Sequence, residues 1–206
     1  MEIYVISSPE NFYGEYNVVA KLLELDRFTF HLRKPFATID DCCFFLNNIP
    51  THFHSKIVLH QHHSLSNKFN VKGLHFKEKD RISKSDSDLN SIKSVNSNLT
   101  LSTSIHELDK FSTITIFDYI FVSPVYDSIS KEAYHSKLVL ADIKNQIIEF
   151  KKISSTKIIA LGGVTSEKLP ELHDVGFDGA AFLGAVWKNS MPNATLKQII
   201  QNASQL

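Results

Sequence analysis

The segment KIIALGGVTSEKLPELHDVGFDGAAFLGAVW, residues 157–187, sets the architecture expected for the whole chain. Two short apolar runs, 158–161 and 180–183, each stop at glycine, as strands buried on both faces of a sheet commonly do. Between them, Thr165 can cap a helix whose apolar residues recur at helical spacing and which ends at Gly176. The segment therefore predicts a strand, a helix and a second strand, with a glycine turn after each strand.

These glycine turns are also the first candidate for a binding site. In a parallel sheet, the turns at Gly162–Gly163 and at Gly184 fall at the same end of adjacent strands. Their backbone N–H groups can converge on one anion, because glycine lets a phosphate approach the chain closely. Paired turns after the last two strands of an eightfold barrel form a recurrent phosphate site. The alternative is that Gly-Gly is only a tight turn.

Alternating strands and helices fill the rest of the chain. Apolar runs predict strands at 3–7, 28–33, 56–60, 71–75, 99–103 and 117–122, and helical spacing predicts helices at 13–25, 38–48, 105–111, 138–152 and 193–203. Residues 77–98 are polar and weakly periodic, so a frayed helix or loop is expected there. Eight strands, nearly all followed by helices, predict an α/β fold, a compact (β/α)8 TIM barrel forming one domain over residues 1–206. A doubly wound open sheet is the rival, but the first turn, SSPENFYG, lacks a dinucleotide glycine pattern.

Composition narrows the functional class. The chain has 206 residues, 43% of them hydrophobic, and a formal net charge of zero, so it can bury a full core and has no bias toward nucleic acid or anionic membranes. No signal peptide or apolar run of transmembrane length is evident. The two cysteines, Cys42 and Cys43, are neighbours and favour reduced thiols over a disulfide. A soluble, cytoplasmic protein is expected.

Polar residues at the carboxyl ends of barrel strands form the site in this architecture. They are Arg33, His60, His75, Ser102, Ser104 and Ser123. Arg33 is the most informative, because a guanidinium at a barrel mouth suits bidentate phosphate or carboxylate binding. The alternative is a solvated surface arginine.

The segment SPVYDSISKEAY, residues 123–134, is longer than a typical loop between a strand and a helix, which favours a functional loop. Ser128, Ser130 and Lys131 supply two hydroxyl donors and one ammonium within four residues. Such a patch can hold phosphate oxygens. A polar surface loop is the alternative.

Five of the ten histidines lie close together in sequence, at positions 52, 54, 60, 62 and 63. A His-x-His pair in a strand directs both rings to one side, so a metal site is conceivable. No cysteine or carboxylate accompanies them at ligand spacing. Solvated loop histidines are therefore the default expectation.

Six motifs, in order and with closely matching spacing, resemble those of the thiamin phosphate synthases and of their relatives, the TenI-type thiazole tautomerases. They are HLRKP (31–35), KGLHFKEKD (72–80), LSTS (101–104), DYIFVSPVYDSISK (118–131), ALGGV (160–164) and DGAAFLGA (178–185). The family's synthase joins a pyrimidine methyl diphosphate to a thiazole phosphate, releasing pyrophosphate with help from Mg²⁺. The resemblance thus implies small-molecule phosphate substrates and a transferase of thiamin biosynthesis.

The resemblance also implies roles for individual residues. Lys131, Ser128 and Ser130 would hold the leaving diphosphate, Arg33 and Ser102 would contact the pyrimidine substrate, and Asp80 would bind Mg²⁺. His31 and His60 occupy positions where the family has a glutamine and an asparagine, so they are expected to bind substrate. The turns at Gly163 and Gly184 would hold the thiazole phosphate.

Several departures from the family pattern leave the reaction open. Gln61 stands where the synthase has a second metal-binding aspartate, and Asp80 alone is a poor Mg²⁺ site. Pro35 replaces a lysine, for which the adjacent Lys34 could substitute, and Ser104 replaces the tautomerase histidine. His106 lies two residues further on and would need a shift to take that place.

Three hypotheses follow. The chain is a synthase in which His60 and His75 compensate for the lost aspartate, or a tautomerase with His31, His60 or His75 as general base, or a non-catalytic, regulatory barrel that binds a thiazole phosphate. The synthase is favoured, because Lys131 and its two serines have little use in a tautomerase. The oligomeric state stays open, although both kinds of relative associate through barrel faces, which makes a homo-oligomer one of the alternatives.

Overall fold

A computed structural model of the chain describes residues 1–106, 114–127 and 139–206. Its strands close into a barrel in sequence order, and all eight pairings are parallel. The strands are β1 (Glu2–Ile6), β2 (Phe28–Leu32), β3 (Ile57–Leu59), β4 (Gly73–Phe76), β5 (Thr100–Ile105), β6 (Tyr119–Val122), β7 (Lys157–Leu161) and β8 (Gly179–Phe182). The predicted (β/α)8 barrel is confirmed, and the open-sheet alternative is wrong because β1 pairs with both β2 and β8.

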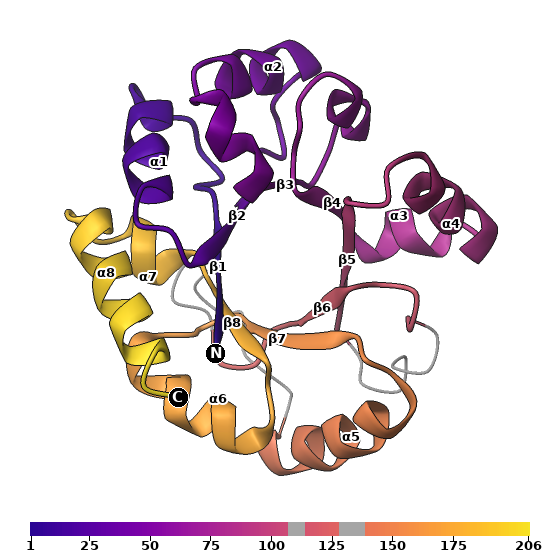
Figure 1. Ribbon diagram of the computed structural model, residues 1–206. Coiled ribbons are helices and arrows are strands. Elements are labelled where there is room, and N and C mark those ends of the chain that lie inside the picture. Colours follow the sequence, from indigo (N-terminus) through magenta and orange to yellow (C-terminus); the bar gives the residue numbers. More distant parts are fainter. Residues whose placement is uncertain (107–113, 128–138) are drawn as a thin grey trace.

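Helices surround the barrel, as Figure 1 shows in a view along the barrel axis from the end at which the strands begin. They are α1 (Glu15–Leu23), α2 (Ile39–Asn47), α3 (Glu78–Ile82), α4 (Asp86–Val95), α5 (Leu140–Ile153), α6 (Leu169–Val175), α7 (Gly184–Trp187) and α8 (Pro192–Ala203). Short 3₁₀ turns lie at η1 (Thr51–Lys56), η2 (His63–Asn67) and η4 (Ser166–Lys168). In the described part of the chain no helix is long and apolar enough to cross a membrane.

Two of the helix boundaries follow their local sequence signals. Thr38 caps α2 through a reciprocal capping box with Asp41. Gly176 ends α6 in the left-handed conformation, at φ 106°. Thr165 precedes η4 without a side-chain capping hydrogen bond, so the predicted continuous helix is instead a 3₁₀ turn followed by α6. Pro170 suits this arrangement, because proline is tolerated in the first turn of a helix.

Two sequence-based predictions need correction. Residues 77–98 hold two helices, α3 and α4, rather than a frayed helix or loop. Ser85 and Asp88 form a capping box that starts α4, and Leu89 buries its apolar side. A strongly polar, exposed helix carries a weak hydrophobic period, so its capping residues were the better signal. The helix predicted at 105–111 begins inside β5, which extends to Ile105, and residues 107–113 lie outside the described residues.

The core has two parts. Most buried apolar side chains lie between the strands and the helices, and a smaller cluster fills the barrel interior. Successive residues of a strand point to opposite faces, so in β2 the side chains of Phe30 and Leu32 join the outer layer while His31 joins the interior. The interior cluster consists of Tyr4, Ile6, Tyr119, Phe121, Ile159 and Ala181. A polar side chain in this interior must find its hydrogen-bond partners inside the barrel.

Candidate functional site

A cavity of about 460 Å³ opens at the carboxyl ends of the strands. The described residues that line it include three cationic side chains, Arg33, Lys77 and Lys79, and one carboxylate, that of Glu78. This end of a barrel is where the active sites of the architecture lie. The excess of positive charge suits an anionic ligand.

Both glycine turns contribute to the lining of this cavity. Gly162 and Gly163 follow β7, and Gly184 begins α7 after β8. Gly162 and Gly163 have φ values of 93° and 65°, which L-residues with side chains rarely adopt. A Cβ at Gly163 would lie 2.2 Å from the carbonyl oxygen of Asp127, because the segment after β6 lies directly on this turn. The glycines therefore admit a close approach of backbone to backbone, and the expected anion site at Gly163 and Gly184 stays a prediction.

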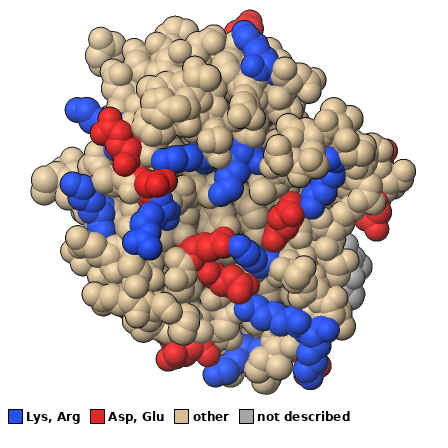
Figure 2. Space-filling view, in the orientation of Figure 1, with Lys and Arg blue, Asp and Glu red and all other residues tan. Residues whose placement is uncertain are grey.

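A larger cavity, of about 720 Å³, lies at the opposite end of the barrel. Figure 2 shows that face, with acidic and basic side chains intermixed around the barrel axis. Three of its five described cationic side chains pair with carboxylates, Lys157 with Glu2, Lys93 with Asp118 and Lys56 with Asp26. Because most of these cations are matched and the active sites of this architecture lie at the other end, the cavity at the carboxyl ends is the better candidate site for an anion.

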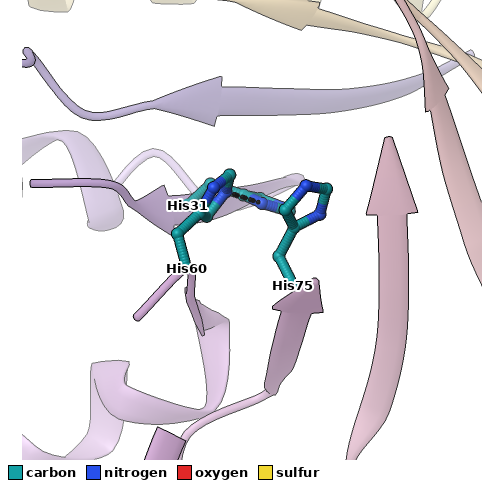
Figure 3. A group of neighbouring side chains, drawn as sticks. All are labelled: His31, His60 and His75. Carbon is teal, nitrogen blue, oxygen red and sulfur yellow. Dashed lines mark hydrogen bonds between the residues drawn. The ribbon is translucent and has the colours of Figure 1, made fainter. Parts of the chain in front are cut away.

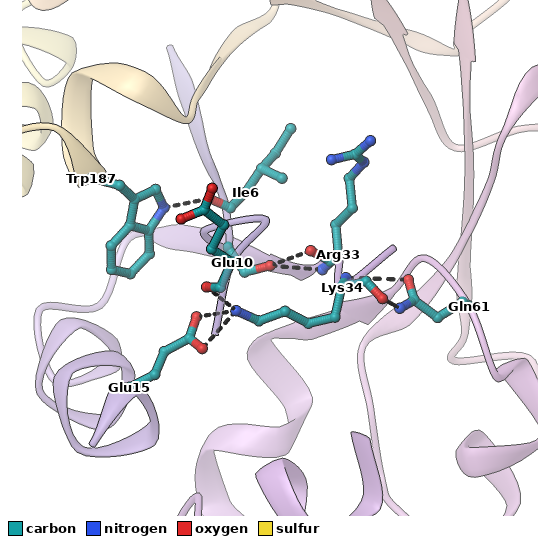
Figure 4. Close-up of polar contacts among 8 residues, drawn as sticks. Ile6, Glu10, Glu15, Arg33, Lys34, Gln61 and Trp187 are labelled. Atoms are coloured by element: carbon teal, nitrogen blue, oxygen red, sulfur yellow. Dashed lines mark hydrogen bonds and ion pairs between the residues drawn. The ribbon is translucent and has the colours of Figure 1, made fainter. Parts of the chain in front are cut away.

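Arg33 is positioned by the ends of two adjacent strands. The backbone N–H of Arg33 donates to the hydroxyl of Ser7 (2.8 Å), and that hydroxyl donates to the Arg33 carbonyl oxygen (2.9 Å). The guanidinium makes no hydrogen bond or ion pair with any residue that the structure describes, and Figure 4 shows it extended away from these contacts. Partial burial lowers the pKa of Arg33, yet a guanidinium stays charged near neutral pH. A half-buried cation that faces a cavity is suited to bind an anion there.

The next residue, Lys34, turns the opposite way. Its ammonium lies 2.6 Å from both carboxylate oxygens of Glu15 and donates to the carbonyl oxygen of Glu10 at 3.0 Å (Figure 4). Only 4% of its side chain is exposed. The expectation that Lys34 could replace the motif lysine is therefore wrong, because its charge is used to join the end of β2 to α1. Gln61 is also engaged with Lys34. Its side-chain oxygen accepts from the backbone N–H of Lys34, and its amide nitrogen donates to the Lys34 carbonyl oxygen.

Three buried histidines meet at the floor of the cavity. His31 lies on β2, His60 directly follows β3, and His75 lies on β4 (Figure 3). His31 Nδ1 and His60 Nε2 are 2.8 Å apart, and the rings of His60 and His75 are stacked at 4.1 Å. His60 and His75 line the cavity, and His31 lies behind them. We call these three residues the histidine cluster.

Hydroxyl groups surround the histidine cluster. The Tyr119 hydroxyl lies 2.8 Å from His31 Nε2, and the hydroxyls of Ser102 and Ser104 each lie 3.0 Å from a ring nitrogen of His75. Burial lowers the pKa of all three histidines, that of His75 to about 3. The three imidazoles are therefore neutral at physiological pH.

The expectation of solvated histidines is wrong for two members of the sequence group. His60 is buried in the cluster, and His54 is buried with its Nε2 near the carbonyl oxygens of Leu46 and Ile49. The partners of His60 come from neighbouring strands. One of them, His31, lies 29 residues earlier in the sequence. Counting ligand spacing along the chain therefore missed the group. The register of β2 against β3 places His31 beside Val58, two positions before His60.

The other predicted site residues are distributed as follows. Ser102 is fully buried under His75 and does not line the cavity, so it reaches a ligand only through His75. Asp80 is exposed on α3 and also lies outside the lining. Lys131, Ser128 and Ser130 lie outside the described residues. His106, which the motif spacing disfavoured, lines the cavity, with its Nδ1 2.7 Å from the Ser123 carbonyl oxygen.

Comparison with known proteins identifies relatives of this barrel. A family model described as thiamine monophosphate synthase matches residues 3–186. A thiamine-phosphate synthase of Limosilactobacillus reuteri is 22% identical over 158 residues, which is 75% of this chain and 69% of the relative. One from Staphylococcus saprophyticus is 24% identical over 144 residues, which is 68% of this chain and 62% of the relative.

Two solved structures have the same architecture. The thiamine phosphate pyrophosphorylase of Bacteroides thetaiotaomicron superimposes with a TM-score of 0.72 at 25% identity, covering 100% of this chain and 95% of that chain. The corresponding enzyme of Pyrococcus furiosus gives a TM-score of 0.75 at 14% identity, covering 99% and 96%. At 14% identity, the similarity to the Pyrococcus furiosus enzyme shows only that the two chains share a fold.

Acid should destabilise the chain through the histidine cluster. Below pH 6.5 an unfolded histidine takes up a proton that folded His75 does not accept until about pH 3, so the unfolded state binds more protons in this range. The free energy of unfolding should therefore decrease as the pH is lowered, by about 1.4 kcal/mol per pH unit for each such histidine. Urea denaturation from about pH 7.5 to about pH 4.5, with EDTA present, measures this slope. His75→Asn should flatten it, whereas His173→Asn, at an exposed position on α6, should leave it unchanged. An equal slope in the His75 variant would contradict the assignment.

The buried pair of Lys34 and Glu15 gives a second prediction. Lys34→Met leaves the Glu15 carboxylate buried without its partner, so the free energy of unfolding should fall by about 3–5 kcal/mol. Glu15→Gln combined with Lys34→Met removes both charges and should recover most of that loss in urea denaturation. Lys152→Met is the control, because Lys152 pairs with Glu149 on the surface and should change stability by at most about 1 kcal/mol. A Lys34→Met variant as mild as this control would contradict the buried-pair interpretation.

Proposed function

Because the chain belongs to the thiamine monophosphate synthase family, we propose that it joins a pyrimidine methyl diphosphate to a thiazole phosphate and releases pyrophosphate. The observation that carries the proposal is the cavity at the carboxyl ends of the strands. There the structure brings together the Arg33 guanidinium and both glycine turns, which lie far apart in sequence.

In the proposed reaction, the bond from the pyrimidine methylene carbon to the diphosphate oxygen breaks, and the bonding electrons leave with the diphosphate. The thiazole nitrogen then donates its electron pair to the methylene carbon, which leaves the thiazolium cation of the product and free pyrophosphate. No proton transfer is needed to balance this step. The task of the protein is therefore electrostatic: it stabilises a leaving anion and holds the second reactant in line.

Cationic and apolar groups divide this task. Arg33, Lys77 and Lys79 line the cavity and can neutralise charge that develops on the diphosphate. We propose that Lys131, Ser128 and Ser130 complete this anion site. Apolar side chains such as Ile6, Phe121 and Leu161 line the same cavity, and they would keep water away from a cationic intermediate. The glycine turns at Gly163 and Gly184 would receive the thiazole phosphate.

The residues do not fit a Mg²⁺ ion held by Asp80. Among the described residues, Asp80 belongs to no group of three or more ligating side chains, and its side chain is exposed outside the cavity. Gln61, at the position of the second family aspartate, is bonded to the backbone of Lys34. Mg²⁺ prefers several oxygen ligands in octahedral geometry. The proposed reaction therefore takes no step through an ion at Asp80.

The tautomerase alternative is less well supported. It requires a general base, and the family position for that base holds Ser104, whose hydroxyl is bonded to His75. The binding-only alternative remains an outcome of the experiment. Both alternatives predict that the thiazole phosphate binds without any release of pyrophosphate.

Arg33→Lys tests the proposed role of the guanidinium. Lysine keeps the charge but loses the planar pair of donors, so kcat/KM for pyrophosphate release should fall about 10- to 100-fold. Arg27→Lys is the matched control, because Arg27 lines the cavity at the opposite end of the barrel and should leave kcat/KM unchanged. Equal kcat/KM values in the two variants would exclude a role for the paired guanidinium donors of Arg33 in substrate binding.

Pyrophosphate release by the wild-type chain tests the reaction itself. Both substrates together should release pyrophosphate, neither alone should do so, and Lys131→Ala should abolish the release. Omitting Mg²⁺ shows whether the reaction needs free or diphosphate-bound metal. Calorimetric binding of the thiazole phosphate with no turnover in any mixture would overturn the synthase proposal in favour of the alternatives.

A further inference from the structure

The proposed reaction assigns no chemical step to the histidine cluster, yet its geometry resembles that of a ligand set. Each of His31, His60 and His75 offers one ring nitrogen, and these three atoms lie within 4.8 Å of one another. Zn²⁺ bound by nitrogen at about 2.0–2.1 Å in a tetrahedron holds its ligand atoms about 3.4 Å apart. The 2.8 Å contact between His31 and His60 is shorter than this spacing, and the 4.8 Å limit is longer. Shifts on the order of an ångström would therefore convert the cluster into a coordination shell.

We propose that His31, His60 and His75 bind one divalent transition-metal ion, with Zn²⁺ as the first candidate, at the floor of the cavity. The ligands come from two strands, β2 and β4, and from the residue directly after β3. A site built on barrel strands is held more rigidly than one built on loops.

The donor chemistry selects the kind of metal. Imidazole nitrogen suits Zn²⁺, Co²⁺, Ni²⁺ and Cu²⁺, whereas Mg²⁺ and Ca²⁺ prefer oxygen ligands. Among the described residues, the group holds histidines alone, with no carboxylate. All three rings are buried and neutral, which is the protonation state that ligates a metal. The cluster therefore differs in chemistry from the family's Mg²⁺ site.

Hydroxyl groups would orient the ligands. With Nδ1 of His31 on the metal, its Nε2 keeps the hydrogen bond to the Tyr119 hydroxyl. His75 has a serine hydroxyl at each ring nitrogen, so one hydroxyl would yield to the metal while the other holds the ring. A partner of this kind on the second nitrogen is usual for metal-binding histidines. The stacked rings of His60 and His75 must rotate apart to direct their nitrogens to one ion.

The fourth coordination position would face the cavity. His60 and His75 line it, next to Arg33, so a bound ion would have three protein ligands and one open side. Catalytic zinc sites have this composition, whereas structural sites are closed by a fourth protein ligand. The open position could take water or a phosphate oxygen. The proposal does not rest on the synthase reaction, because metal binding needs neither substrate.

Cobalt titration tests the proposal on the full chain, freed of metal and carrying no affinity tag. One equivalent of Co²⁺ should give the visible absorption of a four-coordinate site with three nitrogen ligands, and Zn²⁺ should displace it. His31→Asn, His60→Asn and His75→Asn should each weaken Zn²⁺ binding at least ~100-fold. His173→Asn, which changes an exposed histidine, should bind like the wild type. The absence of saturable binding, or equal binding in all four variants, would overturn the proposal.

X-ray absorption on the zinc-loaded wild-type chain covers the case in which a variant fails to fold. Three imidazoles around each zinc ion support the site, and two or fewer refute it whatever the variants do. Pyrophosphate release is measured in a separate assay. A chain that binds zinc without releasing pyrophosphate refutes only the synthase proposal, and one that turns over without binding zinc refutes only the metal site.

Discussion

The pairing of β1 with β8 closes the sheet, and this closure positions every group of the candidate site. An open sheet would leave the turn after β8 at one edge and the end of β2 some distance away. Closure instead places Arg33, the turn after β7 and the turn after β8 around one cavity. Closure also buries the interior side chains, so each polar group there needs a hydrogen-bond partner.

The histidine cluster is the clearest consequence of that interior. Its imidazoles satisfy one another and the hydroxyls of Tyr119, Ser102 and Ser104. Phe121 packs against His31 and His75 at ring distances of 4.8 and 5.1 Å. The same burial that keeps the rings neutral makes them able to bind a metal ion. Two of these histidines, His60 and His75, also line the proposed active site, so the groups that make acid unfavourable for folding lie next to the substrates.

Neighbouring cations at the end of β2 have separate tasks. Side chains of consecutive residues leave the strand on opposite sides, so Arg33 faces the cavity while Lys34 is buried against Glu15. The ion pair joins α1 to the end of β2, and the Lys34 charge does not reach the cavity. Loss of the family lysine at Pro35 is therefore not compensated by its neighbour, which makes Arg33 the principal cation from this strand.

Local patterns in the chain were enough to predict the alternation of strands and helices, the eightfold count and the place of the glycine turns, because these depend on residues near one another in sequence. Short motifs kept in order also indicated the family. Three relations emerge only in the folded barrel: His31, His60 and His75 meet, Lys34 is unavailable, and Ser102 lies beneath His75. Those relations depend on the register between strands and on which face each side chain takes once the barrel has closed. No spacing along the chain encodes a contact that forms only when distant strands become neighbours.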